Sequence, residues 1–203
     1  MGDVVLESLR EIDDVIDGQW RGFGEPGTWL DGPQRVTVVR AARVGAASPT
    51  VVPDSIEEVA ALVSHRASTI TADTIDAIET AGIDRVTYVE IVGIVSRVAA
   101  IDTFDRGIGR TPRALPDPAD GTPSREIVPE ARRRAGWVPT VGAIGPPTAL
   151  TSVRREAAEQ EALHDVLYLS YGGMADLDAD RGLHRTQMEL VAARVSLLND
   201  CFF

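Results

Sequence analysis

Lysine is absent from this 203-residue chain, so all 20 of its basic residues are arginines. A lysine nucleophile or Schiff base is therefore excluded. The only cysteine is Cys201, which cannot form an internal disulfide, and nothing indicates an oxidising compartment. Aromatic residues make up only 5% of the chain, and aliphatic residues supply most of its 44% apolar content. This balance suits packed helices better than a β-sandwich.

Positive charge and long apolar runs are also scarce. The formal net charge of −11 argues against an extended nucleic-acid interface. No apolar run reaches the roughly 18–20 residues that span a bilayer. Residues 3–20 are acidic and amphipathic, unlike a signal peptide. We therefore expect a soluble cytoplasmic protein without nucleic-acid or membrane partners.

Helical spacing of apolar residues dominates the first half of the chain. Capping signals support it, because Ser55 is followed by Glu58 in a capping box and Thr71 is a good helix N-cap. The valines at 36, 38 and 39 also permit a strand, so that segment has two interpretations. The pattern predicts helices over residues 3–17, 33–45, 55–66 and 71–82.

The second half contains two further helical segments and one long connection. Residues 86–101 are apolar almost all round, which is typical of a helix buried on most sides. Eight of the twelve prolines fall within 109–147, which predicts little regular structure. Thr151 or Ser152 is expected to cap the next helix, and a final amphipathic helix begins near Thr186. Every expected element is helical, so the predicted fold class is an all-α helical bundle.

The two most apolar segments can be aligned with each other. The pattern Thr-x-x-Glu followed by apolar residues occurs at 87–90 and again at 186–189, an offset of 99 residues (186 − 87). The same offset places Asp102 opposite Cys201. A duplicated helical unit explains this pattern, and so do two independent amphipathic helices that both begin with a capping box.

The segment MELVAARVSLLNDCFF (188–203) resembles the helix that leads into the Cys-x-x-Cys motif of the alkylhydroperoxidase D / carboxymuconolactone decarboxylase family. The segment YVEIVGIVSRVAAIDTF (88–104) resembles the same helix in a cysteine-free copy, as in duplicated members. The resemblance implies an all-helical, oligomeric protein with two related halves. Its expected parts are an N-terminal extension (1–50), a first half (51–109), a Pro/Gly-rich connection (110–150) and a second half cut off at the redox motif (151–203).

The resemblance also implies a peroxidase chemistry. In that family a glutamate, a Cys-x-x-Cys dithiol and a histidine four residues later reduce a peroxide with electrons from a dithiol reductant, and the site implies no cofactor and no metal. Carried over by position, the glutamate is Glu189 and the first cysteine is Cys201. The second cysteine position follows Phe203, so we expect no peroxide turnover from this sequence by itself. Asp102 and Asp105 occupy the cysteine positions of the first half, which therefore looks structural.

The local sequence adds expectations about these residues. Asn199 and Asp200 are good cap residues, so the long helix should stop there and a new one begin near Cys201. A helix folding back from that point would bring its second turn to Glu189, so Glu189 is expected to serve residues beyond Cys201. The alternative role of Glu189 is to close a capping box with Thr186, and the alternative role of Cys201 is to fill space as a small apolar residue.

Two other functions compete with the peroxidase. One is a catalytically silent helical scaffold that forms homo-oligomers, and the other is lactone decarboxylation, a family activity that does not need the dithiol. The stripe formed by Met188, Val191, Val195 and Leu198 is expected to lie under a partner subunit or to remain exposed.

Two weaker motifs are set aside. The glycines at 22–27 match G-x-G-x-x-G, but no predicted strand precedes them. Glu161 and His164 have the Glu-x-x-His spacing of di-iron bundles, but no second copy exists, so His164 is expected to be a surface or packing residue.

Overall fold

The structure is a computed structural model, which describes residues 2–46 and 52–200. Over these residues the chain is helical, without a named β-strand, and two isolated β-bridges are the only strand-like pairings. The predicted all-α class is therefore confirmed. The α-helices are α1 (Gly2–Gly22), α2 (Gly32–Val44), α3 (Ile56–Arg66), α4 (Ala72–Thr80), α5 (Arg85–Gly107), α6 (Arg154–Leu167) and α7 (Arg185–Leu198).

Side-chain caps fix the starts of the helices in the first half. Asp31 forms a capping box with Gln34 at the start of α2, so the helical interpretation of residues 33–45 is confirmed and the strand is wrong. Ser55 caps α3 by accepting a hydrogen bond from the backbone of Glu58, whose side chain accepts from the Asp54 N–H, and Thr71 caps α4 as predicted. Each cap satisfies a backbone N–H that the first turn leaves unpaired.

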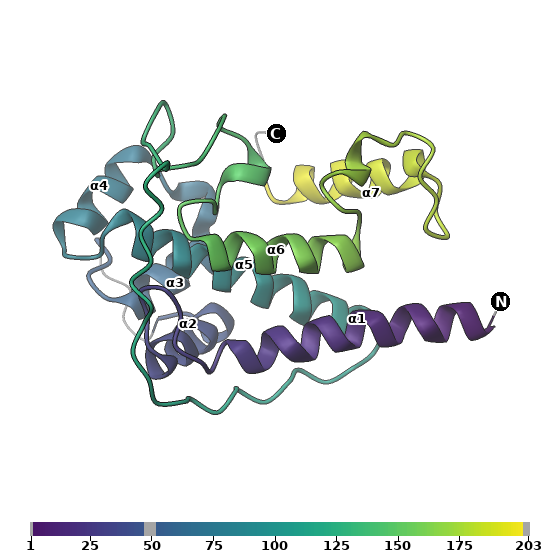
Figure 1. The fold of residues 1–203 in the computed structure, drawn as a ribbon, viewed down its shortest axis with the longest axis horizontal. Helices are drawn as coiled ribbons and strands as arrows, with labels where there is room; N and C mark the ends of the chain where they lie inside the picture. Colours follow the sequence, from purple (N-terminus) through teal and green to yellow (C-terminus); the bar gives the residue numbers. More distant parts are fainter. Residues whose placement is uncertain (1, 47–51, 201–203) are drawn as a thin grey trace.

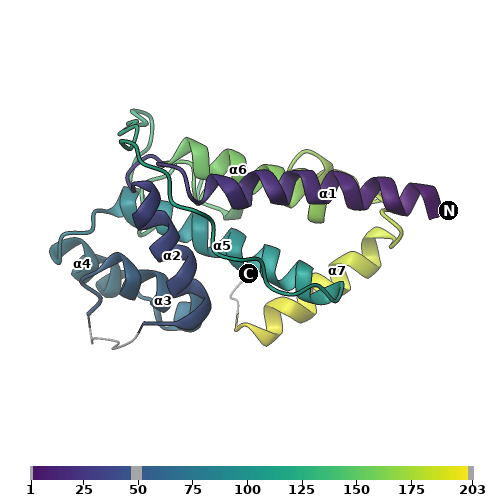
Figure 2. The same ribbon diagram turned by 90° about the horizontal axis from the view of Figure 1, so that it is seen from below.

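Helix α5 is the centre of the molecule. Figure 1 shows α6 lying along it and α1 lying beside α6, while α2 and α3 pack against α5 from the other side. Figure 2 shows the same arrangement from below, with α7 standing apart from the α2–α4 group. The hydrophobic core joins side chains from 1–50, 51–109 and 151–203, including Ile16, Phe23, Val38, Val59, Ile94 and Leu163.

Residues 108–145 contain no helix and are mostly exposed, but hydrogen bonds hold the segment against the rest of the fold. In Figure 1 this segment leaves the end of α5 and returns beside α1. The indole of Trp20 donates to the Ala114 carbonyl at 2.8 Å, and the Ala119 N–H donates to the Gly24 carbonyl at 2.8 Å. A β-carbon on Gly24 would lie 2.2 Å from the Asp117 carbonyl oxygen. The backbones therefore approach closely because position 24 has no side chain.

The start of α6 differs from the prediction. Its N-cap position is Val153, without a side-chain hydrogen bond, and neither Thr151 nor Ser152 caps it. The Thr151 hydroxyl donates to the Thr148 carbonyl at 2.7 Å and accepts from the Val141 N–H, so it is already occupied by the preceding turn.

Helix α7 also starts with an unexpected cap. His184 and Gln187 form its capping box, so the expected box between Thr186 and Glu189 is wrong. The helix ends at Leu198 with Asn199 at its C-cap position, and the sequence predicted that it would stop at Asn199. Helices α5 and α7 differ in environment, because α5 is buried on most sides while only Arg185 and Met188 of α7 are buried. A relation between two halves remains a prediction.

Candidate functional site

Glu189 lies on the first half of α7 and is held by two donors. Its Oε1 accepts a hydrogen bond from the Tyr168 hydroxyl at 2.5 Å and another from Arg185 Nε at 2.7 Å. The Glu189 side chain is 50% exposed, whereas that of Arg185 is 10% exposed. Tyr168 follows directly after α6, so this contact joins the end of α6 to α7. The result is a fixed carboxylate with access to solvent.

These contacts determine the protonation states at Glu189. The hydrogen bond from Tyr168, together with Arg185, lowers the pKa of Glu189 below its ordinary value. Burial and the neighbouring Glu189 charge raise the pKa of Tyr168. At neutral pH the pair therefore consists of an ionised carboxylate and a protonated phenol, and the same hydrogen bonds make this carboxylate a weaker base than a free glutamate.

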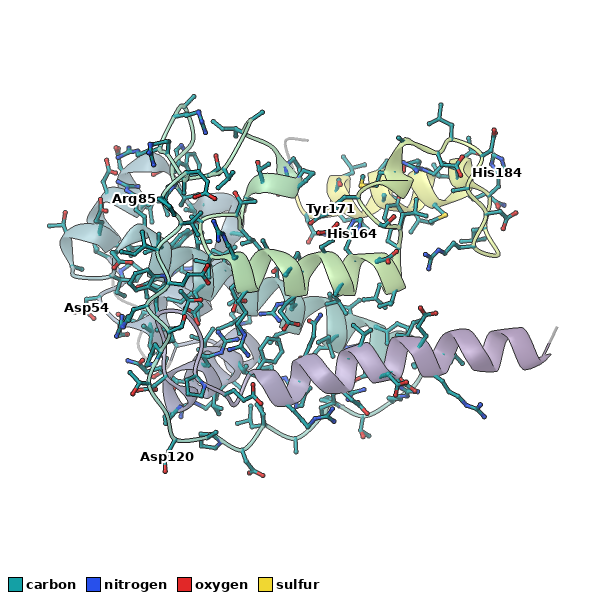
Figure 3. All side chains as sticks on the ribbon, viewed as in Figure 1. Asp54, Arg85, Asp120, His164, Tyr171 and His184 are labelled. Atoms are coloured by element: carbon teal, nitrogen blue, oxygen red, sulfur yellow. The ribbon has the colours of Figure 1, made fainter. Side chains whose placement is uncertain are left out.

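His164 extends this cluster as a packing residue. Its ring meets Tyr168 edge-on at 5.4 Å and lies 5.1 Å from the ring of Tyr171. Figure 3 shows His164 and Tyr171 close together above the end of α6. The Nδ1 atom of His164 pairs with the Leu169 carbonyl, which fixes the ring. The role expected for His164 from the sequence, packing rather than metal binding, agrees with these contacts.

A groove of about 950 Å³ runs beside the cluster. Its walls come from α1, the end of α6, the loop before α7 and α7 itself, and Tyr168 is one of its lining residues. Most of the other lining side chains are apolar, among them Leu9, Ile12, Val166, Leu183, Met188 and Val191. A ligand in this groove would contact a mostly apolar wall, the phenol that is bonded to Glu189, and the charged side chains of Glu11, Asp165, Asp180 and Arg181 at its edges.

Cys201, the other residue predicted for the site, lies outside the described residues. The sequence did not identify Tyr168 and Arg185 as partners of Glu189. Arg185 has a local signal, because it precedes Glu189 by four residues and such residues are neighbours on a helix surface. Tyr168 has none, since it is 21 residues away in another segment.

A second charged cluster is buried in the core, and we call it the buried quartet: Arg35, Glu90, Arg97 and Glu156. Arg35 pairs with both glutamates, at 2.9 Å to Glu156, and Arg97 pairs with Glu156. Their side chains are at most 2% exposed. The buried quartet is closed to solvent and joins α2, α5 and α6 through ion pairs.

Several neighbours complete the buried quartet. The backbone N–H of Trp29 donates to Glu90 Oε2 at 2.6 Å, and the Arg97 guanidinium lies 4.8 Å from the ring centre of Phe23. Gly93 leaves space for the Glu156 side chain, because a β-carbon at position 93 would lie 2.7 Å from a Glu156 oxygen. Burial alone would raise the pKa of Glu156, but Arg97 and Arg35 lower it, whereas burial raises the pKa of Glu90.

Asp102 and Asp105, the residues at the cysteine positions of the expected first half, are both ion-paired. Asp102 accepts hydrogen bonds from Arg43 Nε at 2.8 Å and Nη2 at 2.5 Å. Asp105 accepts from Arg113 Nε at 2.8 Å. Both aspartates thus tie the end of α5 to its neighbours through salt bridges.

Comparison with known proteins leaves the family open. No family model, no curated protein and no solved structure matches this chain. Among residues 2–46 and 52–200, no group of three or more His, Cys, Asp or Glu side chains is arranged to hold a metal ion. Within the same ranges, no helix has the length and apolar character needed to cross a membrane.

Proposed function

We propose that this chain carries part of a thiol-peroxidase site of the alkylhydroperoxidase type, with Glu189 as the proton relay and Cys201 as the first cysteine of the redox pair. The observation that supports it is the state of Glu189. The carboxylate is half-exposed, ionised, and fixed by Tyr168 and Arg185 beside an apolar groove. A proton acceptor in this position suits the activation of a thiol that reaches it from a following segment.

The proposed reaction needs two thiols. The thiolate activated by Glu189 attacks the terminal peroxide oxygen, the O–O bond breaks, and the alcohol leaves after taking up a proton, which produces a sulfenic acid. Cys201, the first cysteine of the motif, supplies the resolving thiol, which attacks the sulfur of the sulfenic acid, displaces water and forms a disulfide. A dithiol reductant then returns the disulfide to two thiols. Since this sequence contains one cysteine, the 203-residue chain should not turn over.

Turnover is tested in two chains, using tert-butyl hydroperoxide and dithiothreitol. The 203-residue chain should consume peroxide no faster than its Cys201→Ala variant. A chain extended after Phe203 by Cys-Ala-Ala-Ala-His should gain turnover, and Glu189→Gln should lower that turnover about 100-fold, as expected for loss of a general base. Glu161→Gln, which changes an exposed glutamate of α6, is the matched control.

Two results contradict the proposal. One is an extended chain that is folded, by circular dichroism, but inactive. The other is equal turnover in the extended chain and its Glu189→Gln variant. Cys201-dependent turnover of the 203-residue chain would contradict the need for a second thiol.

The exposed apolar residues of α7 favour a second candidate, a helical scaffold that forms homo-oligomers. Val191, Val195 and Leu198 are 57%, 52% and 68% exposed, and Met188 is the one member of the predicted stripe that is buried. Covering each exposed side chain in a second copy would be worth about 1.5–3 kcal/mol. Light scattering should therefore show an oligomer that Val195→Asp dissociates and Ala193→Asp, on another face of α7, does not. A monomeric wild-type protein would rule this candidate out.

A further inference from the structure

A second, smaller pocket lies far from Glu189 in sequence. It occupies about 230 Å³ between α4, α5 and the loop that precedes α6. Ile75 comes from α4, and Tyr88, Val89 and Val92 lie on one face of α5. The loop contributes Trp137, Thr140, Ile144 and Leu150. None of the described residues that line the pocket is charged.

The loop wall is held in place by hydrogen bonds. Thr140 exchanges both of its backbone hydrogen bonds with Arg132, at 3.0 and 3.1 Å. Arg85 Nη1 donates to the Trp137 carbonyl at 2.6 Å, which ties the loop to the start of α5. A pocket whose walls are fixed before binding loses little entropy when a ligand enters.

Two hydroxyl groups in this wall lack partners. The Thr140 hydroxyl is buried and forms no hydrogen bond among the described residues. The Tyr88 side chain is 8% exposed, and its hydroxyl forms no hydrogen bond with any described residue, but this oxygen is not among the fully enclosed polar atoms and keeps some contact with solvent. Burial raises the pKa of Tyr88 to about 12, so the phenol remains protonated and can donate. The enclosed Thr140 hydroxyl without a partner is costly, and a ligand oxygen would relieve that cost.

We propose that this pocket binds a neutral, single-ring aromatic compound that carries one hydroxyl or carbonyl oxygen. The volume favours one ring, since a cavity of about 150 Å³ is sufficient for benzene. The apolar lining binds the ring, and the unpartnered hydroxyls of Tyr88 and Thr140 meet its oxygen. An ionised ligand is disfavoured because no cationic side chain lines the pocket to offset its desolvation.

The test uses two ring compounds of nearly equal shape, p-cresol and p-xylene, in calorimetric titrations at pH 7. Wild-type protein should bind p-cresol about fivefold more tightly than p-xylene, the worth of one neutral hydrogen bond. The double variant Tyr88→Phe/Thr140→Val should still bind both but lose this preference. The anion p-toluate should not bind.

A blocking variant checks the location. Ala149 is an exposed residue at the pocket, so Ala149→Phe should weaken p-cresol binding at least tenfold without unfolding the protein. Ala175→Phe, at an exposed position elsewhere, should leave the affinity unchanged. Absence of saturable binding to wild type, unchanged affinity in Ala149→Phe, or a p-cresol preference that survives in the double variant would each overturn the proposal. The result is independent of the peroxidase assay, which depends on Glu189 and Cys201.

Discussion

Replacing Glu156 by glutamine should be among the most destabilising single changes in this protein. Glu156 is fully buried and is the residue that both arginines of the buried quartet share. Glutamine has nearly the same volume but no charge, and its amide group would face guanidinium donors. Arg35 would keep Glu90 as its partner. Arg97 would keep Glu159, at 3.8 Å and with a side chain that is 36% exposed, as its one remaining carboxylate partner among the described residues.

The magnitude follows from opposing contributions. Each arginine attracts Glu156 with about 4 kcal/mol at a charge separation of about 4 Å and an effective dielectric constant near 20. The desolvation of the carboxylate and its repulsion from Glu90 offset part of this attraction. Breaking a buried pair by removing one partner costs about 3–5 kcal/mol, which is our estimate for Glu156→Gln. That loss is large beside a typical total stability of about 5–15 kcal/mol.

Urea unfolding followed by circular dichroism measures the effect. With a urea slope of about 2 kcal/mol per molar, the midpoint should fall by about 2 M. Glu159→Gln removes a half-exposed charge from the same arginine and should cost about 1 kcal/mol or less. If Glu156→Gln does not fold, the double variant Arg97→Met/Glu156→Leu should fold, because an apolar pair of similar volume replaces a buried ion pair with little loss. Equal midpoints for Glu156→Gln and Glu159→Gln would refute the reasoning.

Three further measurements address the same core and its helix ends. Gly93→Ala should cost about 1–3 kcal/mol in urea unfolding because its β-carbon would meet Glu156, whereas Gly18→Ala, with open space around it, should gain about 0.5–1 kcal/mol. Because the pKa of Glu156 is lowered in the folded state, its stabilisation is present above about pH 4.3 and is lost as pH falls through its folded value. The stability difference between wild type and Glu156→Gln should therefore narrow in unfolding curves measured below that pH, and a constant difference would contradict this sign. Asp31→Ala should lower the melting temperature through a loss of about 1 kcal/mol at the α2 cap, and an unchanged melting temperature would show that the cap is dispensable.

Local signals in the sequence predicted most of the helices. Capping residues and apolar spacing act over a few positions, so Ser55 and Thr71 placed α3 and α4 correctly. The same logic failed at α6, because the Thr151 hydroxyl hydrogen-bonds with residues 141 and 148 instead of with the helix start. At α7 the predicted start near Thr186 is one residue from the observed one, but the cap is His184 with Gln187 and not Thr186 with Glu189. Tertiary and loop contacts decide between competing local options.

The buried quartet shows the limit of local reasoning more clearly. Its members come from three helices, and Arg35 is 121 residues from Glu156. The sequence does predict one part of the buried quartet. Glu90 and Arg97 are seven residues apart, so they lie on the same face of one helix, with Gly93 between them. The sequence does not predict that Arg35 and Glu156 pack against that face. The same holds for Glu189, whose partner Tyr168 comes from the end of another helix.

The two charged clusters differ in their exposure to solvent, because the buried quartet is enclosed and Glu189 is half-exposed. The buried quartet joins α2, α5 and α6 and excludes solvent, so its charges stabilise one arrangement of those helices. The cluster at Glu189 lies on α7, whose apolar residues are largely exposed. Binding and catalytic groups are commonly found on the less packed parts of a fold, because substrates must reach them and local motion is cheap there. The buried quartet therefore fixes α2, α5 and α6 to one another, whereas α7 keeps apolar side chains exposed that a second copy of the chain could cover.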